Sequence, residues 1–241
     1  MTEEDGGKAL FPATRLSAFA LLQSTAPAER ERGLDCIAAA YWRPVYVHVR
    51  LKWRKPPEEA RDLTQAFFTS ALEKRLFDGY QQDRGRFRSF LRTCLDRFLA
   101  NEHEAAARLK RGGPRARWMQ VALDDIEPEV ESLVTGEDPE TAFDREWTRS
   151  VFALAIDDLR SEYQAAGKAP RFEVFDQLVL RGDASETYRQ IAERMAIRET
   201  DVSNYLTQTK RDLRRILLQR LRGITSSEEE LDAEARAVLA G

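Results

Sequence analysis

The chain has 241 residues, of which 42% are hydrophobic and 33% charged, and its net charge is −3. This length suits one large or two small domains. The two cysteines, Cys36 and Cys94, belong to no C-x-x-C motif or His/Cys cluster, so we expect buried free thiols, no disulfide and no metal site. Neither a signal peptide nor a membrane-spanning run is recognisable, which favours a cytoplasmic protein that contacts no membrane.

The first third of the chain predicts two long helices after an N-terminal extension, residues 1–32, that ends in a hinge around Pro27. Residues 33–54 carry apolar positions spaced mostly by four, and Pro44 among them predicts a kink or a break. A second helix over 57–75 begins with a proline, which suits a first helical turn. The expected core residues are Leu34, Ile37, Tyr41, Val45 and Val49 in the first helix, and Leu63, Ala66, Phe67, Ser70 and Ala71 in the second.

A basic stretch, residues 84–117, stands out in an otherwise acidic protein. It holds ten basic and three acidic residues, and its apolar positions recur at the spacing of one helix face over 87–111. The loop before it, at 77–86, contains two glycines and is expected to expose Tyr80. Such a local positive field favours nucleic acid as a partner, although a solvated helix face explains it equally well.

The next segment reverses the charge, because residues 124–146 hold ten acidic residues and one arginine. We predict that 118–146 forms a solvated acidic linker between a helical domain at 33–117 and a second one at 147–224. The expected fold class is therefore all-α, with two helical domains, a linker and a C-terminal extension at 225–241 that ends in a short capping helix.

The second domain contains a helix–turn–helix pattern. A short helix at 186–195 and a longer one at 201–222 flank a turn at Ala196, and Thr200 is the expected N-cap of the longer helix. Short polar side chains near the start of such a helix are the types that read base edges. An ordinary helical hairpin explains the same pattern about as well.

The sequence offers no arrangement of catalytic residues. We expect its two histidines, His48 and His103, to be structural, and it contains no G-x-S-x-G, Walker A or G-x-G-x-x-G motif. We therefore expect a protein that is not an enzyme and needs no cofactor.

Several motifs together resemble bacterial RNA polymerase sigma factors of the extracytoplasmic-function (ECF) group. The runs AYWRPVYVHVR, DLTQAFF, DRGRFRSFL and FLANE resemble sigma region 2, and residues 187–222 resemble region 4 with its helix–turn–helix. FPATR and GKAPRFEVF fit a subgroup with additions at both ends. The resemblance covers about residues 11–239, and it implies regions 2 and 4 joined by a linker in the RNA exit path.

The resemblance implies two kinds of partner, core RNA polymerase and promoter DNA, with an anti-sigma factor or another regulatory protein as a further partner. The helix at 57–75 would bind the largest polymerase subunit through Asp62, Leu63, Gln65 and Phe68. The −10 element would meet Tyr80, Arg84, Arg86, Arg88, Arg92, Arg97, Asn101, Lys110 and Arg111. The −35 element would meet Thr200, Ser203, Asn204, Tyr205, Gln208, Lys210, Arg211 and Arg214.

Three alternatives remain open at the level of the sequence. The chain is interpreted first as an ECF-type sigma factor that binds polymerase, recognises both promoter elements and helps to open DNA. A stand-alone helix–turn–helix regulator would bind duplex DNA without polymerase, and a sigma-like adaptor would be directed to its target by another protein. Phosphorylation of Thr64 beside Asp62 would alter polymerase binding, although a surface threonine without that role is the simpler interpretation.

Overall fold

The computed structural model describes residues 17–108, 130, 136–182 and 185–239, and every regular element in these ranges is helical. The first half comprises α1 (Ala18–Leu22), α2 (Pro27–Lys52), α3 (Pro57–Glu73) and α4 (Phe87–Arg108), with two 3-10 turns, Leu76–Gly79 and Gln82–Arg84, before α4. The second half comprises α6 (Pro139–Ala165), α7 (Ala169–Phe175), a π-helical turn (Asp176–Leu180), α8 (Tyr188–Met195), α9 (Glu199–Ile224) and α10 (Glu228–Leu239). The predicted all-α class is confirmed.

The long helices start where the local chemistry favours a start. Prolines occupy the first turn of α2, α3 and α6, where a missing N–H costs nothing. The Asp138 carboxylate accepts the Thr141 N–H at 2.9 Å and so caps α6. At the start of α8, Thr187 and Gln190 form a capping box.

Helix α2 departs from the sequence prediction at its start, and of the kink or break predicted at Pro44 only the break is excluded. It begins at Pro27, inside the segment expected to be a hinge, and continues past Pro44 without a break. The flanking residues Tyr41 and Val45 are fully buried, so packing on both sides of the proline stabilises a helix that lacks one backbone hydrogen bond. The five core residues expected in this helix are all buried.

Helix α1 packs so closely on α2 that glycine is needed at the contact. A Cβ atom added at Gly33 would lie 2.8 Å from the Ala18 carbonyl oxygen and 2.9 Å from the Leu21 Cβ. Only glycine fits at that distance, so Gly33 fixes how α1 lies on the rest of the bundle.

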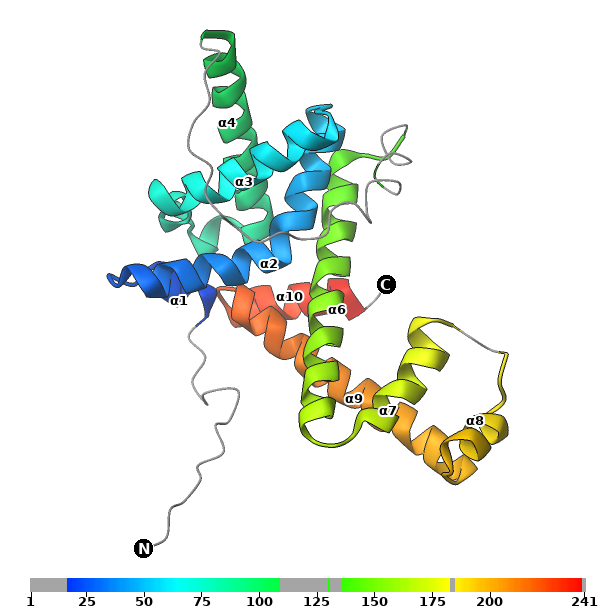
Figure 1. Cartoon of the computed structure of the whole chain (residues 1–241). Coiled ribbons are helices and arrows are strands. Elements are labelled where there is room, and N and C mark those ends of the chain that lie inside the picture. Colours follow the sequence, from blue (N-terminus) through cyan, green and yellow to red (C-terminus); the bar gives the residue numbers. More distant parts are fainter. Residues whose placement is uncertain (1–16, 109–129, 131–135, 183–184, 240–241) are drawn as a thin grey trace, which may run out of the picture.

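Helix α6 connects the two halves of the protein. It packs against α2 on one side and against α7 and α9 further along, and Figure 1 shows it running from the α2–α4 half toward the α7–α9 half. Its residues Phe143, Trp147 and Val151 are buried in the same core as Tyr41 of α2 and Phe87 of α4. In the described part of the chain, the two halves therefore share one continuous core.

The acidic linker expected at 118–146 ends earlier than predicted. Helix α6 already begins at Pro139, and within it Phe143 and Glu146 are buried. Glu146 pairs with Arg43 of α2, and Glu140 and Asp144 lie near arginines of α4. These three acids are thus partners of basic residues elsewhere in the fold. Positions 118–129 and 131–135 lie outside the described residues.

The environments of the cysteines and of His48 can also be compared with expectation. Cys36 is exposed and Cys94 half-buried, so the expectation that both are buried is wrong for Cys36, and both are thiols. His48 is almost fully buried, with Nε2 3.0 Å from the Asp96 carboxylate. That placement agrees with a structural role.

Candidate nucleic-acid and polymerase interface

The outward side of α3 carries the residues expected to contact polymerase, with one exception. Asp62 is exposed, and Leu63 and Gln65 are half-buried, so all three have surface to offer. Phe68 is 2% exposed and stacks on Trp42 of α2, with ring centroids 5.5 Å apart. It supports α3 from inside and offers no surface, whereas Ala66, expected in the core, is exposed.

Thr64, beside Asp62 in sequence, faces the interior. It is fully buried, and its hydroxyl donates to the Ala60 carbonyl at 2.8 Å. The helical spacing of α3 turns Asp62 outward and places Thr64 against the core. The interpretation of Thr64 as a surface residue is therefore wrong, and its hydroxyl is inaccessible to a modifying enzyme in this fold.

The residues expected to contact DNA on and before α4 divide into exposed residues and residues covered by other parts of the fold. Arg84, Arg86, Arg97 and Asn101 are exposed. Arg88 is 5% exposed and forms a double hydrogen bond to Glu234 of α10, at 3.0 and 2.5 Å. Its guanidinium also lies 4.3 Å from the Trp147 ring centroid, so the prediction of Arg88 as a surface residue is wrong in this conformation.

Two more of the expected −10 contacts are partly covered. Arg92 is half-buried, with its guanidinium 5.5 Å from the Phe143 ring centroid and 3.4 Å from Glu140 of α6. Tyr80 is also half-buried rather than exposed, because its hydroxyl donates to the Gly85 carbonyl at 3.0 Å and lies within 3.4 Å of Glu230. Lys110 and Arg111 lie outside the described residues.

Helix α10 supplies two carboxylates that the sequence analysis did not include in any site. Glu230 accepts the Phe87 N–H at 2.7 Å, which caps α4 from the other end of the chain. Glu234 holds Arg88, and burial raises the pKa of its carboxyl although Arg88 opposes the rise. The sequence contains a pattern that could have predicted these buried acids, because Glu230 and Glu234 share a helix face with the apolar Leu231 and Val238. Acids on an apolar face indicate buried pairs.

Helices α8 and α9 form the predicted helix–turn–helix. Ala196 ends α8 in the left-handed conformation, with φ of 53°, and sends the chain directly into α9. Ile191 of α8 and Val202 of α9 are fully buried, so the two helices share an apolar contact. The N-cap of α9 is Arg198, and Thr200 lies inside the first turn, so the N-cap prediction is wrong.

The acidic residue near the start of α9, Asp201, is paired within its own helix. The Asp201 carboxylate accepts hydrogen bonds from the Arg198 backbone N–H at 3.2 Å and from its guanidinium at 3.0 Å. The Arg198 hydrogen bond is the main cause that holds the pKa of Asp201 below its ordinary value. The paired charges cancel most of the repulsion that Asp201 would exert on a phosphate.

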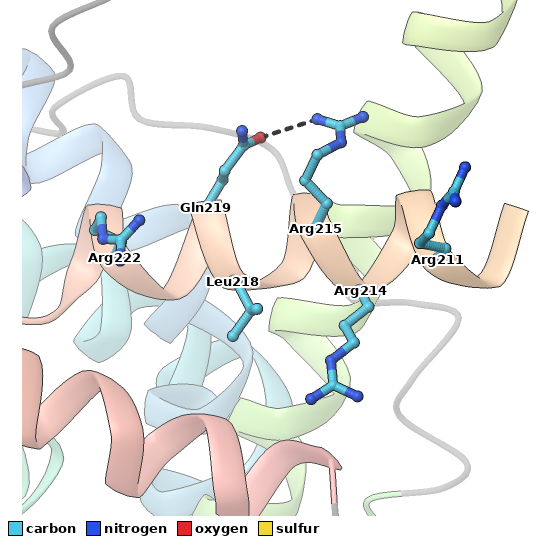
Figure 2. Close-up of a pocket in the computed structure, with 6 residues that line it drawn as sticks. All are labelled: Arg211, Arg214, Arg215, Leu218, Gln219 and Arg222. Carbon is cyan, nitrogen blue, oxygen red and sulfur yellow. Dashed lines mark hydrogen bonds between the residues drawn. The ribbon is translucent and has the colours of Figure 1, made fainter. Parts of the chain in front are cut away.

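The other residues expected at the −35 element lie along one long helix. Thr200, Ser203 and Asn204 are exposed near its start, and Lys210, Arg211 and Arg214 are exposed further along. Figure 2 shows Arg211 and Arg214 on this helix. Tyr205 and Gln208 are half-buried and engaged by Arg171 of α7, whose guanidinium lies 5.1 Å from the Tyr205 ring centroid and donates to Gln208 at 2.5 Å. Helix α7 thus fixes two of the expected contact residues from behind.

Comparison with known proteins identified no relative, since no family model, no curated protein and no solved structure matched the chain. Within the described ranges, no three side chains of His, Cys, Asp or Glu are grouped so that they could hold a metal ion. No described helix combines the length and the apolar character that crossing a bilayer requires.

Proposed function

We propose that this protein is a sigma-like promoter-recognition factor that binds core RNA polymerase and promoter DNA. The observation that carries the proposal is the helix–turn–helix of α8 and α9, with exposed Ser203 and Asn204 at the reading end and exposed basic residues behind them. Helices enter the major groove with their N-terminal residues at the base edges and with basic residues at the phosphates.

In this proposal α3 is the polymerase-binding helix. Asp62 is its exposed acid, and Leu63 beside it offers an apolar, half-buried edge, a combination that suits a protein partner with a basic rim. The −10 contacts fall to the exposed Arg84, Arg86 and Arg97, because a separated DNA strand requires cationic support.

Binding to purified core polymerase tests the proposal. We expect the full chain to bind, and Asp62→Ala to weaken binding about tenfold, which is typical of one lost charged contact. Asp157→Ala, which removes another exposed acid, from α6, is the control and should bind normally. Run-off transcription from a pool of genomic fragments then tests for promoter-specific initiation. Absence of polymerase binding by the unmodified chain would refute the proposal.

A stand-alone DNA-binding regulator is the second candidate, and the covered arginines of α4 favour it. Arg88 and Arg92 are paired with acids of α10 and α6, so the described conformation offers fewer free cations for a single strand than the sequence suggested. This candidate predicts tight, salt-dependent duplex binding without polymerase. Specific duplex binding together with no polymerase binding would establish it over the sigma-like function.

A further inference from the structure

The outer side of α9 has two chemically different halves. Exposed residues recur every three or four positions from Ser203 to Arg222, so they share one side of the helix. The first half of this side carries short polar side chains, Ser203, Asn204 and Thr207. The second half carries four arginines, which we call the arginine row: Arg211, Arg214, Arg215 and Arg222. Figure 2 shows them projecting from one stretch of α9.

The charges of the arginine row are largely available to a partner. Among the described residues, Arg211 and Arg214 have no acidic side chain within ion-pair distance. Arg215 lies 2.7 Å from Glu162, and Arg222 lies 3.5 Å from Glu228. All four side chains in these two pairs are more than 40% exposed. Exposed pairs of this kind are weak, so both arginines can exchange a carboxylate for another anion.

The surface between these arginines is a shallow depression of about 390 Å³. Half-buried Leu218 lines it together with the aliphatic parts of the arginine side chains. Cationic groups around an apolar lining suit a sugar–phosphate chain, since the guanidinium groups bind phosphates and the apolar surface meets the sugars. An acidic protein segment would satisfy the charges but would leave Leu218 without a partner.

The length of α9 separates the arginine row from the reading end. Nineteen positions divide Ser203 from Arg222, which is about 28 Å along the axis at 1.5 Å per residue. The major groove is only about 12 Å wide. A straight helix that places Ser203 at the base edges therefore carries Arg222 out of that groove, so the far arginines need a different stretch of backbone.

We propose that the arginine row binds the sugar–phosphate backbone of duplex DNA beyond the groove that the start of α9 reads. This inference rests on the DNA-binding part of the proposed function but not on polymerase binding. It assigns sequence reading to Ser203 and Asn204 and sequence-independent affinity to the arginine row. The phosphates reached through Arg222 lie outside the segment whose bases are read.

The salt dependence of duplex binding tests the assignment with the full chain. The probe is a labelled duplex of about 30 base pairs selected by this protein from a random pool, compared with a scrambled duplex. We expect the double variant Arg214→Gln/Arg222→Gln to reduce the slope of log K against log salt by about two, because each phosphate contact contributes about 0.9. The loss of affinity should be the same for both duplexes.

Two controls separate this effect from a general loss of charge or of fold. Lys74→Gln/Arg75→Gln removes two exposed charges from the end of α3 and should leave the slope unchanged. Asn204→Ala should reduce the preference for the selected duplex and leave the slope unchanged. Thermal melting verifies that each variant is folded.

Two outcomes would overturn the inference. One is an equal slope for the arginine variant and the α3 control, which would mean that the arginine row is a solvated face. The other is a loss confined to the selected duplex, which would place these arginines at base edges. Polymerase binding by α3 is measured in a separate experiment. A protein that fails to bind polymerase can therefore still show, or fail to show, the salt dependence expected for the arginine row.

Discussion

At the scale of single residues, Asp96 is the best-defined electrostatic feature between α2 and α4. Its carboxylate lies 3.0 Å from His48 Nε2, 2.7 Å from Lys52 Nζ and 3.1 Å from Trp53 Nε1. Burial favours the neutral acid, but the hydrogen bonds from His48, Lys52 and Trp53 outweigh it and hold the pKa of Asp96 well below its ordinary value. The ionised carboxylate therefore stabilises the joint between α2 and α4.

Replacement of Asp96 should cost stability in a pH-dependent way. We expect Asp96→Asn to lower the free energy of unfolding by about 1.5–3 kcal/mol at pH 7, the range for hydrogen bonds to charged groups. Because the folded-state pKa is depressed, the contribution is present above the unfolded value of about 4 and is lost as pH falls below it. Urea unfolding at pH 7, 4 and 3 should show the stability gap beginning to narrow at pH 4 and clearly smaller at pH 3. Exposed Asp157→Asn is the control, and a gap that stays constant down to pH 3 would contradict the account.

Sequence patterns predicted burial well where a residue type and its spacing agreed. Leu34, Tyr41 and Val49 are buried as expected, because apolar side chains at helical spacing form one face of the helix, and that face packs against the core. Phe68 and Arg88 are different, since each depends on a partner distant in sequence, Trp42 for one and Glu234 for the other. Local spacing contains no information about such partners.

At the scale of elements, α10 is the helix whose role was least predictable. A short capping helix was expected, and α10 does cap α4, but through carboxylates rather than through apolar contact alone. Its polar contacts reach Tyr80, Phe87 and Arg88, which belong to the segment proposed to meet DNA. The geometry of that segment therefore depends on α10.

Loss of the Glu234 charge should destabilise the protein strongly. Glu234→Gln would leave the buried Arg88 with only the half-exposed Asp144 as a counter-charge, and breaking such a pair costs about 3–5 kcal/mol. Thermal or urea unfolding measures the loss, with the exposed Glu228→Gln on the same helix as a control. The double variant Arg88→Met/Glu234→Leu should recover most of the stability, since apolar pairs replace buried ion pairs at little cost. A loss below 1 kcal/mol for Glu234→Gln would contradict this account.

The acidic start of α6 shows why charge patterns misled the linker prediction. Ten acids in a short stretch indicate a solvated segment when only neighbours in sequence are considered. In the fold, Asp138 caps the helix, Glu146 pairs with Arg43, and Asp144 lies 3.1 Å from Arg88. Glu146 and Asp144 thus neutralise arginines that lie more than 40 positions away in the sequence, and a local charge balance does not reveal such partners.

At the scale of the whole molecule, the spacing of the two proposed promoter elements is greater than the length of the helix that joins the two halves of the protein. Promoter elements named −10 and −35 are centred about 25 base pairs apart, which is about 85 Å of duplex at 3.4 Å per pair. Helix α6 joins the α4 half to the helix–turn–helix half, and its 27 residues span only about 40 Å. Helix α6 by itself spans less than half of that spacing, and we predict that the two halves move apart when both elements are bound.

A distance measurement tests this requirement. Labels at Glu104→Cys on α4 and Arg189→Cys on α8, in a chain with Cys36→Ser and Cys94→Ser, report the spacing of the two halves by pulsed electron resonance. We expect a longer distance after addition of core polymerase and promoter DNA than in the free protein. The same labels with duplex DNA alone are the control. An unchanged distance in a transcribing complex would contradict the predicted separation of the two halves.

The cap that Glu230 provides for α4 also constrains the order in which the protein can be made. Phe87 and Glu230 are 143 positions apart, and the first turn of α4 lacks this partner until both have been synthesised. At 5–20 residues per second, translation takes roughly 7–30 s to bridge that interval. In a nascent chain, the first turn of α4 therefore lacks the Glu230 cap, and Arg88 lacks the Glu234 carboxylate, for several seconds. Chaperones and proteases that bind incomplete folds have that interval in which to act.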